Sequence, residues 1–289
     1  MNALLKGRFI MSERRFAVIG HPIGHTMSPF IHKRLFELAG IEGDYTVIDV
    51  PPEKLPEMIK ELDTLRGYNI TIPNKQRIIP FLDRLHERAQ LYGSVNTVSN
   101  HNGRTGYTTD PDGFLKALEH GGIPLSGNVV LLGCGGAART FAFEAVLAGC
   151  SVTIAARAES RVRQEALAKE IKEKLKDAQV SCCLLSEISG DYDLLVNGTP
   201  VGMYPHTDEM PITEKALSKC ACVFDAVYNP LRTRLVECAA ANGSIAVGGM
   251  SMLVWQAVAA HSIWDGSEYD PEDIKQLEED SAKEQSRLF

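Results

Sequence analysis

The stretch that decides the fold reads NVVLLGCGGAAR and runs from Asn128 to Arg139. Its first six residues form a run of strand residues that ends at Gly133, which is typical of a buried strand. The next residues have the spacing GxGxxA, and the helical pattern ARTFAFEAVLAG follows them. Such a turn brings the backbone close to a pyrophosphate, and the helix N-terminus offers free N–H groups. We therefore expect a Rossmann unit that binds a dinucleotide, rather than a glycine-rich turn without a ligand.

The residues expected to hold the dinucleotide at this turn are small, because a side chain would keep the backbone away from the phosphates. They are Gly133, Gly135, Gly136, Ala137 and Ala138. The next strand, SVTIAAR, ends at Arg157 without the acidic residue that usually bonds the ribose of NAD. Arg157 and Arg161 match a phosphate in charge and geometry, so we predict NADP(H) as the cofactor. The alternatives are that Glu159 favours NAD(H), or that both arginines are merely solvated.

Two later segments also read as strands that end in polar loops, YDLLVNGTPVGM and CVFDAVYNP. In an open parallel sheet, ligands bind outside the carboxyl ends of the strands. We therefore expect Thr199, Pro200 and Ala226 to reach the cofactor, and Tyr228 to reach the same cleft. Gly249 is expected where the backbone passes close to the nicotinamide.

The first third of the chain alternates strands and helices in a similar way. Expected strands cover 15–20, 44–50 and 67–73, and expected helices cover 28–40, 52–65 and 75–93. This β-α-β-α-β-α order predicts a second α/β domain. At the other end of the chain, the apolar segment from Met252 to Trp264 predicts a buried helix. The acidic tail beyond Asp270 is expected to cover the outside of a domain.

The segment NITIPNKQ, residues 69–76, carries a candidate catalytic lysine. Apolar Ile70 and Ile72 alternate with polar Asn69 and Thr71, which predicts a half-buried strand that stops at the following proline. Lys75 comes two residues after that proline. It is either a solvated surface residue or an ammonium group that the strand end directs into a cleft.

The composition excludes several classes of function. The 289 residues are 44% hydrophobic and 23% charged, as in ordinary globular proteins. A net charge of −7 argues against nucleic-acid binding, and no apolar run reaches the roughly 18 residues of a membrane span. The seven cysteines form no CxxC motif, so we expect inert thiols in a reducing cytoplasm and no metal site. The N-terminal decapeptide is too short and too interrupted for a secretory signal, and residues 1–11 are expected to be disordered.

Several separated motifs, in order, resemble those of shikimate dehydrogenases. They are GHPIGHTMSPFIH, YNITIPNK, GSVNT, TTDPDGF, LLGCGGAAR, NGTPVGM, DAVYNPLRTRL and GGMSMLVWQA. The resemblance extends from about Phe16 to about Trp264. It implies reversible reduction of 3-dehydroshikimate to shikimate by NADPH, a step of chorismate and aromatic amino-acid biosynthesis. It also implies an α/β fold with a substrate domain (1–111), a Rossmann NADP domain (112–248) and C-terminal helices that return to the first domain (249–289).

The resemblance also assigns roles to individual residues. Lys75 and Asp110 match the family's catalytic pair. An ammonium group can stabilise the negative charge that forms on a ketone oxygen and can donate the proton, which supports this assignment on chemical grounds. The expected ligands of the substrate carboxylate are Thr26, Ser28 and Tyr228, and those of the ring oxygens are Thr71, Asn96, Asp110 and Gln256. The family implies a monomer or a homodimer.

Two alternatives stay open. Most family members have serine at the position of Thr26, and threonine adds a methyl group that stiffens the side chain. A quinate/shikimate dehydrogenase that uses NAD or NADP is therefore the first alternative. The second is an NADP-binding sensor without catalytic activity, although such a protein would be expected to lack the lysine or the aspartate.

Overall fold

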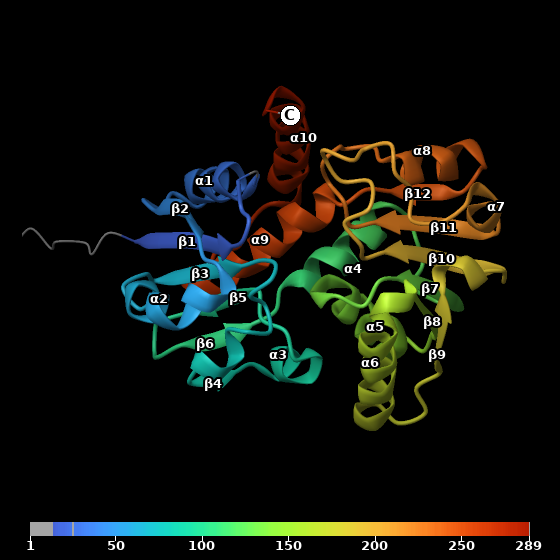
Figure 1. Cartoon of the computed structure of the whole chain (residues 1–289). Coiled ribbons are helices and arrows are strands. Elements are labelled where there is room, and N and C mark those ends of the chain that lie inside the picture. Colours follow the sequence, from blue (N-terminus) through green and yellow to red (C-terminus); the bar gives the residue numbers. More distant parts are fainter. Residues whose placement is uncertain (1–13, 25, 289) are drawn as a thin grey trace, which may run out of the picture.

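The computed structural model describes residues 14–24 and 26–288 and shows two β-sheets joined by helices (Figure 1). The disorder predicted for residues 1–11 falls outside the described residues. Among the residues that the structure does describe, no helix combines the length and the apolar character that crossing a membrane requires.

The first sheet has six strands in the order β2-β1-β3-β5-β6-β4. They are β1 (Arg15–Gly20), β2 (Asp44–Asp49), β3 (Gly67–Ile70), β4 (Arg84–Leu85), β5 (Thr97–Ser99) and β6 (Thr105–Tyr107). The same part of the chain contains the helices α1 (Ser28–Ala39), α2 (Leu55–Leu62) and α3 (Glu87–Tyr92). β1 pairs in parallel with β2 and β3, as the predicted alternation of strands and helices requires. β5 pairs antiparallel with β3 and β6, and neither β5 nor β6 was predicted from the sequence.

The helix predicted over 75–93 is wrong for most of its length. A 3-10 turn covers Ile79–Phe81, β4 follows it, and only α3 is α-helical. Pro80 lacks the backbone donor that a helix interior needs. Asp83 accepts a hydrogen bond from the backbone N–H of Arg104 at 2.8 Å, next to the point where β4 pairs with β6. This competing partner is distant in sequence, so apolar spacing alone could not reveal it.

The strand before Lys75 is also shorter and more buried than predicted. β3 ends at Ile70, and all four of its residues are buried because it lies between β1 and β5. Ile72 is 66% exposed, so the predicted alternation of buried and exposed positions is wrong. The backbone still bonds the neighbouring strand beyond Ile70, since the N–H of Thr71 donates to the carbonyl of Ile19 at 2.8 Å.

The second sheet is parallel throughout, with the order β12-β11-β10-β7-β8-β9. Its strands are β7 (Asn128–Leu132), β8 (Ser151–Ala156), β9 (Val180–Leu184), β10 (Tyr192–Asn197), β11 (Cys220–Asp225) and β12 (Ile245–Val247). Its helices are α5 (Gly136–Leu147), α6 (Arg161–Lys174), α7 (Glu214–Leu217) and α8 (Arg234–Ala241). Counted from β7, this is the strand order 3-2-1-4-5-6 of a Rossmann fold, and the predicted fold class is confirmed.

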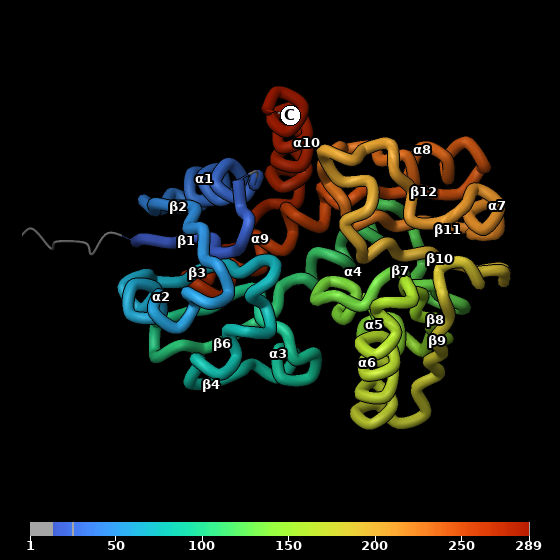
Figure 2. The backbone as a smooth tube through the Cα atoms, in the orientation of Figure 1, coloured from blue at the N-terminus to red at the C-terminus, as the bar shows by residue number. Residues whose placement is uncertain are grey.

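Two helices connect the halves of the molecule. The chain leaves the first sheet through α4 (Asp110–His120) and returns through α9 (Met250–Asp265), as the tube in Figure 2 shows. The two helices cross at Gly113, where an added Cβ would lie 2.4 Å from the carbonyl oxygen of Met252. The far end of α9 reaches the first sheet, because the indole N–H of Trp264 donates to the carbonyl of Val98 at 2.9 Å.

The last helix, α10 (Pro271–Leu288), also packs on the first domain. Its Ile274 and Leu277 are buried in one apolar cluster with Ile31 and Leu35 of α1. The predicted return of the C-terminal helices to the first domain is therefore confirmed.

A second contact between the halves is ionic. Arg88 of α3 donates to Asp112 of α4 and to Glu144 of α5, each at 2.8 Å. The hydroxyl of Tyr92 donates to the same Glu144, which is buried. Because its charge is paired and hydrogen-bonded, Glu144 can be buried at this seam without an isolated charge.

Candidate active site

Lys75 and Asp110 form a shielded ion pair at the junction of the two halves. Lys75 lies in the turn after β3, and Asp110 is the first residue of α4. The Nζ and Oδ2 atoms are 2.6 Å apart, and the side chains are only 15% and 3% exposed. The pair is therefore not the solvated surface contact that lysine most often makes, and its attraction is less screened by water.

Asn96 holds the other oxygen of Asp110. Its Nδ2 lies 2.9 Å from Asp110 Oδ1 and 3.0 Å from Gln256 Oε1, so this amide group, immediately before β5, joins α4 to α9. The Asn96 Oδ1 accepts the backbone N–H of Thr109 at 2.7 Å, which sets the direction of the amide. These bonds bring together the predicted site residues Lys75, Asp110, Asn96 and Gln256.

A second group of predicted residues lies around the start of α1. The hydroxyl of Thr26 donates to that of Ser28 at 3.1 Å, and the backbone N–H of Ser28 donates to Thr26 Oγ1 at 3.2 Å. Thr26 also hydrogen-bonds Tyr228, and burial raises the pKa of that phenol. Thr71 lies at the end of β3, where its methyl group packs against the backbone of Gly20. No described contact joins Thr71 directly to the lysine.

The structure adds residues that were not selected from the sequence. Asn69 of β3 donates to Thr97 Oγ1 at 3.0 Å and to the carbonyl of Asn96 at 3.3 Å. The hydroxyl of Tyr45 donates to Asn69 Oδ1 at 2.7 Å. Asn69 and Thr97 are buried polar residues within strands, and a polar residue in a central strand is the signal that could have identified them.

The glycine turn after β7 has the shape that a dinucleotide requires. Gly133 has φ +99, a conformation that favours glycine, and an added Cβ would lie 2.9 Å from Thr199 Cγ2. Gly135 faces open space, since an added Cβ would meet no atom within 4 Å. Ala138 packs against Gly198, where an added Cβ would lie 2.8 Å from the alanine Cβ. The free N–H groups at the start of α5 therefore stand beside space that a pyrophosphate can fill.

This turn lies next to the Lys75–Asp110 pair. A Cβ built on Gly136, the first residue of α5, would lie 3.6 Å from Cδ of Lys75. The predicted cofactor loop and the predicted catalytic lysine come from different sheets, and they meet at this point.

Both predicted phosphate ligands, Arg157 and Arg161, follow the carboxyl end of β8 in the second sheet. Arg157 and Arg161 are 69% and 70% exposed. Arg157 pairs with Glu159 at 3.4 Å and Arg161 with Glu165 at 2.8 Å, so each guanidinium has one carboxylate beside it. Exposed pairs of this kind contribute little to stability, and both cations are accessible to a phosphate.

A buried carboxylate organises the next two strand ends. Asp225 accepts hydrogen bonds from Asn197 at 2.9 Å, from the backbone N–H of Val227 at 3.0 Å and from Thr233 at 2.6 Å. Burial raises its pKa to about 6, and the three hydrogen bonds oppose that shift. Asn197 in turn accepts from the hydroxyl of Thr199 at 2.7 Å, which fixes the predicted cofactor loop after β10.

The remaining predicted cofactor residues lie along the same edge. Ala226 follows β11, and an added Cβ on Gly249 would lie 2.3 Å from its carbonyl oxygen, so the two backbones are in direct contact. Pro200 is exposed next to Thr199.

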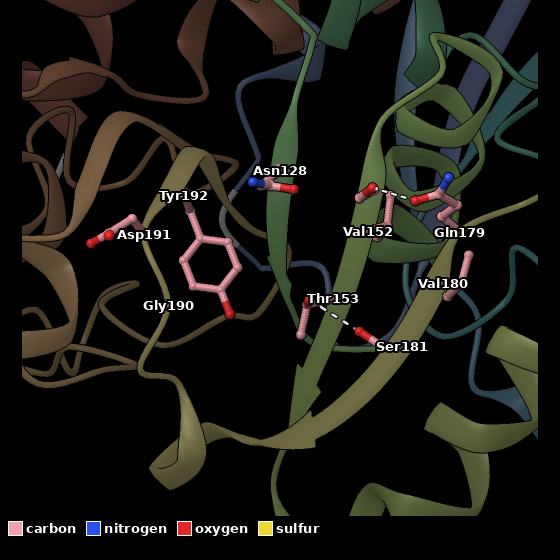
Figure 3. A pocket seen from close by; sticks show the side chains of 10 residues that line it. Asn128, Val152, Thr153, Gln179, Val180, Ser181, Gly190, Asp191 and Tyr192 are labelled. Carbon is pink, nitrogen blue, oxygen red and sulfur yellow. Dashed lines mark hydrogen bonds between the residues drawn. The ribbon is translucent and has the colours of Figure 1, made fainter.

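A cavity of about 370 Å³ lies elsewhere, at the amino ends of β7 to β10 (Figure 3). Four of its polar side chains pair with one another, since Ser151 bonds Gln179 at 2.8 Å and Thr153 bonds Ser181 at 3.1 Å. It contains none of the predicted site residues, and ligands of parallel sheets bind at the opposite, carboxyl ends.

All seven cysteines are free thiols, and they range from buried, as at Cys220, to exposed, as at Cys182. Burial raises the pKa of the Cys220 thiol to about 11, which disfavours its reactive thiolate.

Comparison with known proteins gives a consistent result. A family model described as the shikimate dehydrogenase substrate binding domain matches residues 18–98. A shikimate dehydrogenase (NADP(+)) of Caldanaerobacter subterraneus is 37% identical over 262 residues, which cover 88% of this chain and 92% of the relative. The crystal structure of shikimate 5-dehydrogenase from Thermus thermophilus, in complex with NADP(H) and shikimate, has 36% identity and a TM-score of 0.82 and covers 92% of this chain and 99% of that one. A quinate dehydrogenase from Corynebacterium glutamicum in complex with NAD has 28% identity and a TM-score of 0.81, with 92% and 98% coverage.

The raised pKa of Asp225 predicts a pH-dependent stability. Between about pH 4 and pH 6 the folded chain binds a proton that the unfolded chain has released, so this group's contribution to the free energy of unfolding falls by about 3 kcal/mol as pH rises. Asp225→Asn cannot titrate. The free energy of unfolding of wild type minus that of the variant should therefore fall across this window in urea titrations. Exposed Asp191→Asn is the control, and a wild-type–Asp225→Asn difference that stays constant with pH would contradict the raised pKa.

Proposed function

Because the chain belongs to the shikimate dehydrogenase family, we propose that it catalyses the reversible, NADPH-dependent reduction of 3-dehydroshikimate to shikimate. The observation that carries this proposal is the shielded Lys75–Asp110 pair beside Gly136, the first residue of the cofactor helix. A proton donor and a dinucleotide turn at one place are what reduction of a ketone to an alcohol requires.

Lys75 acts on the oxygen of the reacting carbonyl. When the carbonyl carbon is reduced, negative charge develops on this oxygen, and the ammonium group stabilises it and then donates a proton from Nζ. The pair is only 15% and 3% exposed, so the charge is stabilised where water screens it weakly. In the reverse direction, the neutral amine of Lys75 accepts the hydroxyl proton of shikimate.

Asp110 positions the lysine. Its Oδ2 accepts from Lys75, and its Oδ1 accepts from Asn96 at 2.9 Å, so the carboxylate cannot rotate without breaking one of these bonds. Asp110 is also the first residue of α4, where the positive end of the helix dipole stabilises its carboxylate.

The substrate ligands follow from the same geometry. Thr26, Ser28 and Tyr228 present hydroxyl groups for the carboxylate, and burial keeps the Tyr228 phenol neutral by raising its pKa. Asn96, Gln256 and Thr71 are assigned to the ring oxygens. Amide and hydroxyl groups suit a polyhydroxylated ring, because they can both donate and accept hydrogen bonds.

NADP(H) is assigned to the carboxyl ends of the strands of the second sheet and supplies the hydride when bound. Its pyrophosphate is assigned to Gly133, Gly135, Gly136, Ala137 and Ala138, and Thr199, Pro200, Ala226 and Gly249 line the path toward the lysine. Arg157 and Arg161 are assigned to the phosphate on the adenosine ribose, since each offers a fork of N–H donors.

The remaining assignments are coarser. We infer a substrate domain at 1–111, an NADP domain at 112–248 and C-terminal helices at 249–289, with a cytoplasmic monomer or homodimer as the working unit. A quinate/shikimate dehydrogenase using NAD or NADP is the second candidate. It is favoured by the extra methyl group of Thr26 and by the similarity to a quinate dehydrogenase.

Steady-state kinetics with two substrates and two cofactors test the activity directly. Shikimate and quinate are each oxidised with NADP+ and with NAD+, and shikimate with NADP+ should give the highest kcat/KM. A higher value for quinate would favour the second candidate. Cofactor binding without turnover of either acid would instead identify a catalytically silent sensor.

Replacing the lysine tests its chemical role. Lys75→Ala should lower kcat by roughly 100-fold or more, as loss of a general acid does, with little change in the KM for shikimate. Lys116→Ala removes an exposed cation of α4 and should behave as wild type. A Lys75→Ala variant with near-normal kcat would refute the assignment.

Replacing the arginines tests the choice of cofactor. Arg157→Ala and Arg161→Ala should each raise the KM for NADP+ by about tenfold, the effect of losing one charged hydrogen bond, and should leave the KM for NAD+ unchanged. Lys169→Ala, an exposed cation later on the same helix α6, is the matched control. Equal effects on both cofactors would show that the arginines do not recognise the additional phosphate.

A further inference from the structure

A buried chain of three polar side chains lies behind the substrate side of the site. The Nδ1 of His32 on α1 is 3.0 Å from the Nε2 of His261 on α9. The Nδ1 of His261 is 2.8 Å from the hydroxyl of Tyr269, which precedes α10. Both imidazoles are buried, at 2% and 0% exposure. These three residues, called the imidazole chain below, join α1 and α9 to the segment that precedes α10.

The imidazole chain ends on Asn69 and Tyr45. His32 forms a side-chain hydrogen bond with Asn69, and because its Nδ1 faces His261, the nitrogen left for this bond is Nε2. The ring of His32 also stacks on that of Tyr45, with centroids 4.0 Å apart and planes at 9°. The hydroxyl of Tyr45 donates to Asn69 Oδ1 at 2.7 Å, so His32 and Tyr45 hold the same amide group.

Asn69 and Tyr45 lead to both groups of proposed substrate ligands. Asn69 donates to Thr97 Oγ1 at 3.0 Å, and Thr97 donates to Asn96 Oδ1 at 3.1 Å. Asn96 is the amide that holds Asp110. On the other side, Tyr45 hydrogen-bonds the side chain of Ser28, a proposed ligand of the carboxylate.

One arrangement of protons satisfies the whole imidazole chain. The backbone carbonyl of Asn96 can only accept a hydrogen bond, so the NH₂ group of Asn69 faces it and Asn69 Oδ1 faces His32. His32 must then donate from Nε2 and accept at Nδ1 from the Nε2–H of His261. The hydroxyl of Tyr269 has two acceptors within reach, the backbone carbonyl of Leu35 at 3.2 Å and Nδ1 of His261 at 2.8 Å, and in this arrangement it donates to the nearer His261 Nδ1. Both imidazoles are therefore neutral Nε2–H tautomers, and every hydrogen bond points from Tyr269 toward Asn69.

The surroundings favour this neutral state. Burial lowers the pKa of His32 well below its usual value and that of His261 to about 4. Asp265 is the charged neighbour that favours a protonated His261, and the effect of burial exceeds it. The carboxylate oxygen Oδ1 of Asp265 accepts a hydrogen bond from the hydroxyl of Ser267.

We propose that His32, His261 and Tyr269 are positioning residues that hold Asn69 and Tyr45, and through them Asn96 and Ser28, in the geometry that binds the substrate. This role rests on the shikimate dehydrogenase activity proposed above. It assigns to the imidazole chain an effect on substrate affinity, since none of its three members touches the Lys75–Asp110 pair in the described contacts. Lysine chemistry and cofactor binding should be unaffected by its loss.

Nitrogen NMR of the ¹⁵N-histidine-labelled full-length chain tests the proton arrangement without requiring turnover. His32 and His261 should each show a protonated Nε2 and an unprotonated Nδ1, with assignments taken from His32→Asn and His261→Gln spectra. Both should stay neutral down to pH 5. A protonated Nδ1 on either neutral ring would overturn the arrangement.

Kinetics of matched variants test the positioning role. His261→Phe keeps a ring and removes both nitrogens, so the KM for shikimate should rise about fivefold, the order expected for one lost hydrogen bond, while kcat and the KM for NADP+ stay near wild type. His261→Gln retains an acceptor and a donor and should restore most of the affinity. Tyr269→Phe, which removes only a hydroxyl, should give a smaller rise in the same KM.

Tyr68→Phe is the control for these variants. Tyr68 precedes Asn69 on β3, and its buried hydroxyl makes no hydrogen bond among the described residues, so its removal should leave the KM unchanged. If His261→Phe and Tyr269→Phe lower the melting temperature but keep the wild-type KM, the imidazole chain has only a structural role and the proposal fails. If wild type itself does not oxidise shikimate, the proposed function fails, and the NMR result still decides the proton arrangement.

Discussion

The architecture of the site depends on the close crossing of α4 and α9 at Gly113. An added Cβ there would lie 2.4 Å from the backbone of Met252, so the helices can approach this closely only because the residue has no side chain. α4 carries Asp110 at its first turn, and α9 carries Gln256 just beyond the crossing. The approach brings both side chains within reach of Asn96 on the first sheet. One missing methyl group thus places residues from two helices and a strand in a single network.

The buried polar network imposes a second constraint. Burying Asn69, Asn96, Thr97 and Asp110 would be costly if any of their polar atoms lacked a partner. Here each side chain is bonded to the next, and backbone groups at Asn96 and Thr109 fix the direction of the amides. A network whose donors have one consistent arrangement resists reorganisation, which suits a site that must stabilise charge as it develops. The same reasoning extends outward to His32 and His261.

Much of the fold was predictable because it is encoded by local patterns. Each strand, glycine turn and helix of the second sheet is contiguous in sequence, and parallel pairing through crossover helices follows from their alternation. The antiparallel strands β5 and β6 were not predicted, because each has three residues and is recognisable only through its partners. The helix predicted over 75–93 was wrong for the same reason. The apolar residues of this segment have helical spacing, but part of its backbone pairs with residues 104–106 instead.

The sequence by itself determined the chemistry that is available to this protein: a glycine-rich dinucleotide turn, arginines in place of an acidic ribose ligand, and a lysine and an aspartate within family motifs. These properties depend on residue identity and short-range spacing, which a sequence states directly. Only the tertiary structure decided which groups meet. Lys75 and Gly136 lie 61 positions apart in the chain, and His32 and His261 are separated by 229 positions, yet the members of each pair are neighbours in space. Contacts of this kind depend on how the two sheets and their connecting helices pack, and packing is a property of the whole fold.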